Sequence, residues 1–327
     1  MAEKKKIIAV IGPTATGKTA LGLSLARRLS GEIVSCDSMQ IYRGLEIGTA
    51  QPSPRELSEA KHHLIGFLSW NESFSVSDYV NTAKKVIEEI HARRHMPVLV
   101  GGTGLYARAL LRGFTFKEEC KDSGLRLELM QQAQSLGPEE MHRRLEALDP
   151  QSAKDIHPNN VKRVVRALEY CIAANEPFSM QARRSQQAQP PYESLMICPV
   201  YENRQLLYDR IDARVDKMIE GGLVEEAGRF YEYCKGLKKL PTAAQSIGCK
   251  ELFPYFQGEI ELPVAVENIK RESRRYAKRQ LTWFAREPGI RYLYLDKLGG
   301  IDEIVDEALD ILYKAGFVDK EAVKSGI

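Results

Sequence analysis

The chain has 327 residues, of which 28% are charged and 43% belong to the hydrophobic set, and its formal net charge is only +3. This composition is ordinary for a globular protein, and the length suffices for one large core or two domains. The apolar runs are too short to cross a bilayer, so we expect no membrane contact. The run that follows the lysines at 4–6 leads into a glycine-rich loop. We interpret it as a first strand rather than as a secretion signal.

The cysteines form no C-x-x-C pair; they are Cys36, Cys120, Cys171, Cys198, Cys234 and Cys249. A disulfide framework or a zinc site would need closer or more regular spacing. We therefore expect reduced thiols and a cytoplasmic location.

Apolar, β-rich runs alternate with segments of helical periodicity along much of the chain. The expected strands are residues 6–11, 32–36, 97–101, 194–201 and 290–295. This alternation is typical of an α/β fold with a parallel sheet covered by helices on both faces. Ligands of such folds bind at the carboxyl ends of the strands.

The β signal disappears between about 114 and 193, where the sequence has only amphipathic helical patterns. We therefore predict a core made of residues 1–113 and 194–327, with a helical insertion domain at 114–193. After residue 202 the chain is mostly helical again, and a last helix is expected from about 302 to 315.

The first predicted strand ends in a loop that matches G-x-x-x-x-G-K-[ST] at every fixed position. The loop comprises Gly12, Pro13, Thr14, Ala15, Thr16, Gly17, Lys18 and Thr19. Backbone N–H groups of such a loop bind phosphate oxygens, the lysine contacts the terminal phosphate and the threonine hydroxyl holds Mg²⁺. The sequence thus predicts a P-loop NTPase-like site for linked phosphates.

Asp37 follows the second predicted strand and therefore lies beside this loop. Its carboxylate could ligate Mg²⁺, accept a proton as a general base, or only cap the next turn. The third strand ends in two glycines that let the backbone turn before Thr103, which we expect to cap a helix.

Basic side chains gather on three predicted helices. Arg210 and Arg214 share a helix face, where they could clamp a diphosphate or pair with Asp209, Asp212 and Asp216. A second helix carries Lys162, Arg163 and Arg166 opposite an apolar face. Residues 267–286 contain seven Lys or Arg against two Glu. The second and third groups predict either a nucleic-acid surface or solvated helix faces.

Together these stretches resemble the tRNA dimethylallyltransferase family. The matching segments are GPTATGKT, DSMQIYRGLEIGTA, HHLI, GGTGLY, RALEY, LYDRIDARVDKMIEGGLVEE and YAKRQLTWF, in the family's order from residue 12 to 284. The resemblance implies a magnesium-dependent transfer of a dimethylallyl group from dimethylallyl diphosphate to N6 of adenosine 37. The acceptor tRNAs would read codons that begin with U, and a monomer would suffice.

The resemblance also implies roles for individual residues. Asp37 would be the catalytic base, Thr103 would lie in the reaction channel, and Arg214 with the phosphate loop would stabilise the departing diphosphate. Thr19 would hold Mg²⁺. The implied tRNA contacts are Asp37, Ser38, Met39, Gln40, Thr103, Lys162, Arg163, Arg166, Arg274, Arg275, Lys278 and Arg279.

The chain departs from the family pattern in places. Lys162 stands where the family often has Gln, and Ser246 and Cys249 replace Ala and Tyr, so no role is transferred to the latter two. No zinc-finger pattern is present, which indicates the shorter bacterial form. The rival interpretations are a small-molecule kinase on the same loop and a non-catalytic RNA-binding protein. The helical insertion and the basic stretch at 267–286 are more than a small acceptor needs, which counts against the kinase. An intact Lys18-Thr19 pair and Asp37 count against a non-catalytic protein.

Overall fold

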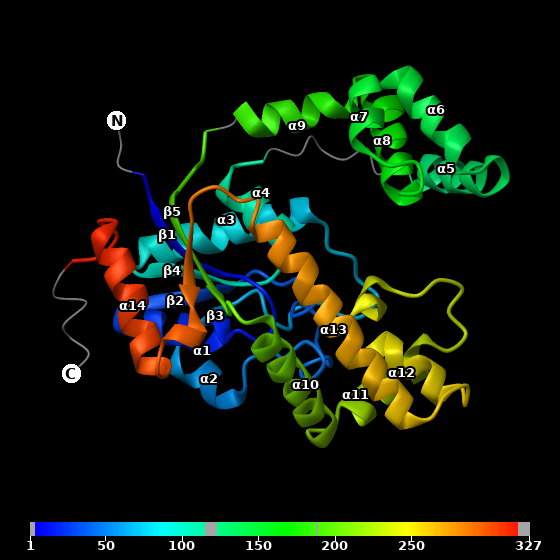
Figure 1. The fold of residues 1–327 in the computed structure, drawn as a ribbon. Coiled ribbons are helices and arrows are strands. Elements are labelled where there is room, and N and C mark those ends of the chain that lie inside the picture. The colour runs from blue at the N-terminus through cyan, green and yellow to red at the C-terminus, as the bar shows by residue number, and fades with distance from the viewer. Residues whose placement is uncertain (1–3, 115–122, 188, 320–327) are drawn as a thin grey trace. The chain divides into compact units, whose positions relative to one another are not determined.

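The computed structural model describes residues 4–114, 123–187 and 189–319 (Figure 1). The chain forms two compact units, one made of residues 1–111 and 191–327 and the other of residues 112–190. Among the described residues, no helix combines the length and apolar character needed to cross a membrane.

The first unit is built on a six-stranded parallel sheet with the order β3-β2-β4-β1-β5-β6. Its strands are β1 (Lys6–Ile11), β2 (Gly31–Ser35), β3 (His62–His63), β4 (Met96–Gly101), β5 (Glu193–Val200) and β6 (Ile290–Tyr294). The P-loop-like α/β fold and the five strands expected from the sequence are confirmed. Residues 7–11 of β1 are at most 1% exposed, which explains the continuous apolar run.

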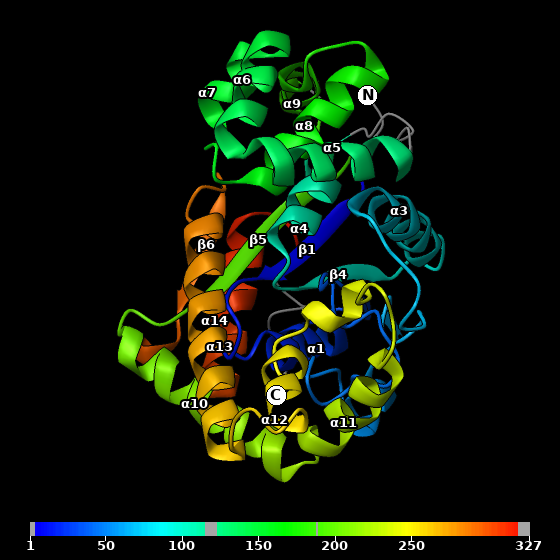
Figure 2. The ribbon, with the colours of Figure 1, turned by 90° about the vertical axis from the view of Figure 1, so that its right-hand side faces the viewer.

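Helices surround this sheet (Figures 1 and 2). They are α1 (Lys18–Arg28), α2 (Pro54–Glu59), α3 (Val76–Ala92), α4 (Gly104–Leu111), α10 (Arg204–Glu220), α11 (Leu223–Cys234), α12 (Cys249–Phe256), α13 (Leu262–Phe284) and α14 (Ile301–Lys314), with short 3-10 turns at Thr242–Gln245 and Leu295–Lys297. α1 and α14 share one apolar core with side chains of β1, β4, β5 and β6. α13 packs along α10 and α12.

Two local features are not indicated by the sequence patterns. The helical tract that follows residue 202 is divided into α10 and α11 at Gly221 and Gly222. Gly222 has φ of +98°, a left-handed conformation that ends the helical path and suits glycine. His62 and His63 form the short edge strand β3, which pairs with β2, although their region carries no β-rich run.

The second unit is helical. It contains α5 (Ser123–Leu136), α6 (Pro138–Leu148), α7 (Pro150–Asp155), α8 (Val161–Ala174) and α9 (Phe178–Gln187). Its core includes Val164, Val165 and Leu168, the apolar face that the sequence indicates for α8. Residues 115–122, which include Cys120, lie outside the described part of the chain.

Candidate active site

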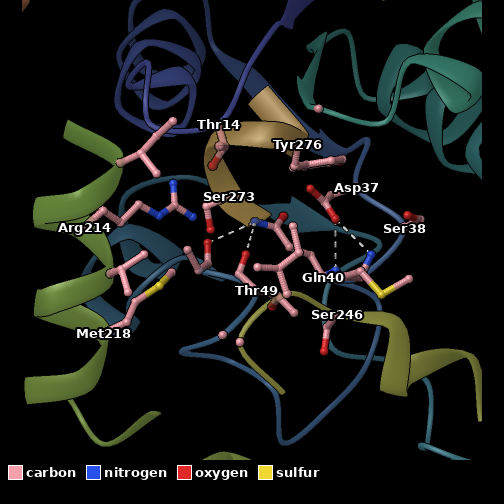
Figure 3. Close-up of a pocket in the computed structure, with 18 of the residues that line it drawn as sticks. Thr14, Asp37, Ser38, Gln40, Thr49, Arg214, Met218, Ser246, Ser273 and Tyr276 are labelled. Atoms are coloured by element: carbon pink, nitrogen blue, oxygen red, sulfur yellow. Dashed lines mark hydrogen bonds between the residues drawn. The ribbon is translucent and has the colours of Figure 1, made fainter. Parts of the chain in front are cut away.

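A cavity of about 340 Å³ opens in the first unit, where the carboxyl ends of β1, β2 and β4 meet α10 and α13. Thr14, Asp37 and Arg214 lie around it on three different segments (Figure 3). Parallel strands bring their carboxyl ends to one edge of the sheet, which is why residues distant in sequence line one space.

The phosphate loop forms one end of the cavity, through Thr14, Lys18 and Thr19. Gly17 precedes α1 with φ of +74° and has no side chain that could cap the helix. The first-turn N–H groups of α1 are therefore available to an anion. The Thr16 hydroxyl donates to the Pro13 carbonyl at 2.9 Å, which holds the loop closed on itself. Gly12, Ala15 and Gly17 contribute backbone to this loop.

Lys18 and Arg214 give this end of the cavity a strongly positive character. Burial and the nearby Arg214 guanidinium lower the pKa of Lys18 to about 8. The Lys18 ammonium donates to the Pro13 carbonyl at 2.5 Å. Burial also lowers the pKa of Arg214, while Asp37 opposes that shift. Two crowded cations with one nearby carboxylate form a site that favours a multiply charged anion.

Arg210 and Arg214 do not act as a pair, although they share a helix. Arg214 lines the cavity, whereas Arg210 donates to the Ala15 carbonyl at 3.2 Å and lies over the Tyr201 ring. Of the two alternatives for these arginines, the one in which neighbouring aspartates pair with them is wrong. The three carboxylates contact other side chains: Asp209 binds Gln205, Asp212 binds Arg274 and Asp216 binds Lys270.

Asp37 occupies the cavity wall between the phosphate loop and the end of β4. Its Oδ1 accepts N–H bonds from Met39 at 2.9 Å and Gln40 at 3.4 Å, so the carboxylate does cap the following turn. In the part of the chain that the structure describes, Oδ2 accepts no hydrogen bond. The capping role and a role in the cavity are therefore compatible, because they use different oxygens.

Thr103 follows β4 and meets the segment after β2. Its hydroxyl oxygen accepts the Ser38 N–H at 3.0 Å, a contact that the expected helix-capping role did not predict. Tyr276 of α13 lies on the cavity wall near Asp37 (Figure 3). Burial, together with the Asp37 charge, raises the pKa of the Tyr276 phenol, so the phenol stays neutral.

The Gln40 side chain forms hydrogen bonds mainly with backbone carbonyl groups. Its Nε2 donates to the carbonyls of Thr49 and Ala50, and its Oε1 accepts from the Ser35 hydroxyl. These bonds fix the segment Gly48–Ala50 against the cavity. The predicted tRNA contact of Gln40 remains a prediction, and its amide would have to leave these partners to make it.

The basic residues of α13 fall into two groups. Arg274 binds Asp212 and Arg275 binds Glu272. Lys278 and Arg279 are exposed, and within the described residues neither has a carboxylate partner; Arg279 also lines the cavity. On α8, which belongs to the second unit, Lys162 and Arg163 are exposed and Arg166 binds Glu169.

Sequence reasoning missed several cavity residues. Ser273, Tyr276 and Gln280 recur at helical spacing within the basic stretch and form the face that α13 turns to the cavity. The density of charges in this stretch masks that face in the sequence. Apolar side chains complete the wall: Ile211, Val215, Met218, Leu223, Ile247 and Ile269. Cys249, where the chain departs from the family pattern, is buried, and Ser246 lines the cavity.

Comparison with known proteins identifies the family. The family model for IPP transferase matches residues 40–287. The chain is 46% identical over 288 residues to the tRNA dimethylallyltransferase of Geobacillus thermodenitrificans, covering 88% of this chain and 90% of that protein. It is 44% identical over 318 residues to the enzyme of the same name from Geobacillus kaustophilus, covering 97% and 99%.

Solved structures agree with this result. The full-length tRNA isopentenylpyrophosphate transferase of Bacillus halodurans aligns with a TM-score of 0.67 at 40% identity, over 96% of this chain and 98% of that one. A eukaryotic dimethylallyltransferase acting on tRNA aligns with a TM-score of 0.82 at 26% identity, over 97% and 81%. The chain therefore belongs to the IPP transferase family, the family of the tRNA dimethylallyltransferases.

Proposed function

We propose that the protein transfers a dimethylallyl group from dimethylallyl diphosphate to N6 of adenosine 37 in tRNAs that read codons beginning with U. The products are N6-dimethylallyladenosine and diphosphate. The observation that carries the proposal is one cavity lined by the phosphate loop, Asp37 and Ser38, with the Thr103 hydroxyl accepting the Ser38 N–H. Relatives of this family bear the name tRNA dimethylallyltransferase.

The phosphate loop and Arg214 bind the diphosphate of the donor. Loop N–H groups, the Lys18 ammonium and the Arg214 guanidinium stabilise the negative charge that grows on the bridging oxygen as the C1–O bond breaks. The apolar side chains of α10, with Val215 and Met218 among them, give the five-carbon group a wall that does not compete for hydrogen bonds.

Asp37 accepts the proton that the acceptor loses. The exocyclic amine of adenine is a weak nucleophile because its lone pair is delocalised into the ring. As N6 bonds to C1, positive charge develops on N6, and the free Oδ2 of Asp37 can take the proton. Oδ1 stays bound to the N–H of Met39, which holds the carboxylate in place throughout the reaction.

The residues present fit a bound Mg²⁺. The Thr19 hydroxyl lines the cavity beside Lys18, and a hydroxyl oxygen is a hard ligand of the kind Mg²⁺ prefers. The described residues hold no cluster of three or more His, Cys, Asp or Glu that could form an all-protein cage. Thr19 would hold the cation, which would neutralise charge on the diphosphate.

The acceptor tRNA presents its anticodon stem-loop to this site. Adenosine 37 must leave the base stack to reach the cavity, because a stacked base does not expose N6 to a buried donor. We assign Ser38 and Thr103, which are joined by the bond from the Ser38 N–H to the Thr103 hydroxyl, to the path of the entering base. Lys278 and Arg279 offer charges for backbone phosphates. Lys162, Arg163 and Arg166 supply a further basic group in the helical unit. We place the reaction in the cytoplasm and assign it to a monomer.

A transfer assay tests the proposal. Purified protein with Mg²⁺ is given labelled dimethylallyl diphosphate and an unmodified tRNA with A36-A37-A38, and label is expected in the tRNA at residue 37. The matched control tRNA carries guanosine at 37 and should stay unlabelled. ATP-dependent phosphorylation of a small acceptor without labelling of tRNA would instead support a kinase.

A further inference from the structure

One buried side chain joins the two halves of the candidate active site. Gln280 of α13 is 5% exposed. Its Oε1 accepts the Thr14 N–H at 2.9 Å, and its Nε2 donates to the Gly102 carbonyl at 2.9 Å. Both functional ends of one amide are thus satisfied, one by the phosphate loop and the other by the turn after β4.

The two partners belong to opposite sides of the proposed reaction. Thr14 lies in the loop that would bind the donor diphosphate, while Gly102 directly precedes Thr103, which binds the Ser38 N–H next to Asp37. A single rigid amide therefore spans the distance between the donor side and the acceptor side. Within the described hydrogen bonds, no other side chain bonds to both Thr14 and Gly102.

The absence of a side chain at Gly102 leaves room for the Gln280 amide. A Cβ atom at Gly102 would lie 2.2 Å from Gln280 Nε2, so a side chain at 102 would push the amide away. Gln280 also lies on the face of α13 that carries Ser273 and Tyr276, all of which line the cavity. The helix that carries the proposed tRNA-binding charges is thereby held in register with the phosphate loop.

We propose that Gln280 is a positioning residue that sets the spacing between the donor C1 and the acceptor N6. The inference rests on the proposed transfer reaction and deepens it. The role of Gln280 is to hold Thr14 and Gly102 at a fixed separation, because both ends of its amide are bonded to these two residues. Because reaction rates depend steeply on the alignment of the two reactants, a small change in this separation slows transfer without weakening the binding of either substrate.

The first test replaces Gln280 by Met, which conserves volume but forms neither hydrogen bond. Inorganic diphosphate affinity and tRNA affinity should stay within about threefold of wild type, while the single-turnover transfer rate falls about 100-fold. Thr282→Val is the matched control, because it removes an intrahelical hydrogen bond on the exposed side of the same helix. Its transfer rate should not change.

The second test uses Gln280→Glu and a pH profile. A protonated glutamic acid can accept from Thr14 and donate to Gly102 as the amide does, whereas the carboxylate faces the Gly102 carbonyl and repels it. The ratio of the variant's transfer rate to that of wild type should therefore rise as the pH is lowered. Because a buried carboxylate also lowers the stability of the fold as the pH rises, the folded fraction is measured at each pH and the transfer rate is expressed per folded protein. A ratio that stays constant with pH after this normalisation would contradict the inference.

Two outcomes overturn the inference while leaving the proposed function intact. One is a Gln280→Met enzyme that transfers at the wild-type rate; the other is a loss that appears entirely in substrate affinity. By contrast, wild-type protein that binds diphosphate but never labels tRNA would refute the proposed function itself.

Discussion

Arg274 of α13 binds the carboxylate of Asp212 on α10, with Nη1 2.6 Å from Oδ2 and also in contact with Oδ1. Both side chains are about one-third exposed. This pair ties together the two helices that form one side of the cavity. Arg274, which the family resemblance implies as a tRNA contact, therefore already has a carboxylate partner within the protein.

Arg274→Gln is therefore expected to lower the free energy of unfolding by about 1 kcal/mol, the upper range for a partly exposed ion pair. Urea denaturation measures this change. In Arg274→Gln, the Asp212 carboxylate loses its partner. The double variant Arg274→Gln, Asp212→Asn should be no less stable than this single variant, because it also removes that carboxylate charge. Equal stability of wild type and Arg274→Gln would contradict the structural role.

We expect Lys278 and Arg279 to carry the larger share of tRNA attraction on α13, because both are exposed and neither has a carboxylate partner among the described residues. Replacing both by Ala is expected to weaken tRNA binding and to reduce the slope of log affinity against log salt by about one for each lost phosphate contact. Arg275→Ala is the control, since Arg275 is paired with Glu272 and should change the slope less. Filter binding over a salt series measures both. Identical slopes in all three proteins would show that this face is only solvated.

The sequence predicts most of this fold because the relevant signals are local. β1 and β4 are buried on both faces, so each appears as an uninterrupted apolar run. β3 escapes detection because its two residues are histidines. His63 is accommodated there by the buried carboxylate of Glu32 at 2.6 Å, a contact that only the folded sheet creates.

The same distinction between local signals and contacts made only in the folded chain applies to the candidate site. Lys18, Thr19 and Asp37 follow strand ends, so the rule for parallel sheets brings them together without knowledge of the packing. Gln280 could not be found in this way, because its role depends on how α13 docks against a loop 266 residues away in sequence. The same limit applies to Asp212, for which the sequence offers only partners on its own helix and not Arg274.

The Asp37→Asn variant separates the proposed role of Asp37 as a general base from its role in capping the turn. The amide oxygen can still accept the Met39 N–H, so the turn and the tRNA affinity should persist. Turnover should fall about 10²- to 10⁴-fold, because the amide cannot take the proton from N6. Single-turnover transfer and tRNA binding, measured on the same preparation, give both quantities. A turnover close to wild type would leave Asp37 with its capping role alone.

Lys18 predicts a pH dependence of donor binding. With its pKa lowered to about 8, the side chain is charged below that pH and loses its charge above it. The affinity for inorganic diphosphate should therefore fall as the pH rises through about 8, and binding there should be accompanied by proton uptake. Calorimetry in buffers of different ionisation enthalpy measures both effects. Lys18→Arg stays charged and should show no such uptake; uptake equal to wild type would identify another group.

Glu32 stabilises the fold at the end of β2 opposite Asp37. The Arg93 guanidinium holds the pKa of this buried carboxyl well below its usual range, with His63 and His95 adding hydrogen bonds. Because the folded-state pKa lies below the unfolded value, the stabilisation is present above pH of about 4.3 and is lost as the pH falls further.

Glu32→Gln is accordingly expected to lower the free energy of unfolding by about 2 kcal/mol at neutral pH, since it removes the charge from a buried ion pair. The difference from wild type should shrink as the pH is lowered, and transfer activity at neutral pH should be retained in the folded fraction. Glu88→Gln removes an exposed partner of Lys5 and should change stability by less than about 0.5 kcal/mol. If the difference in free energy of unfolding between Glu32→Gln and wild type stayed constant down to acid pH, its cause would be a change in packing and not the loss of the carboxylate charge.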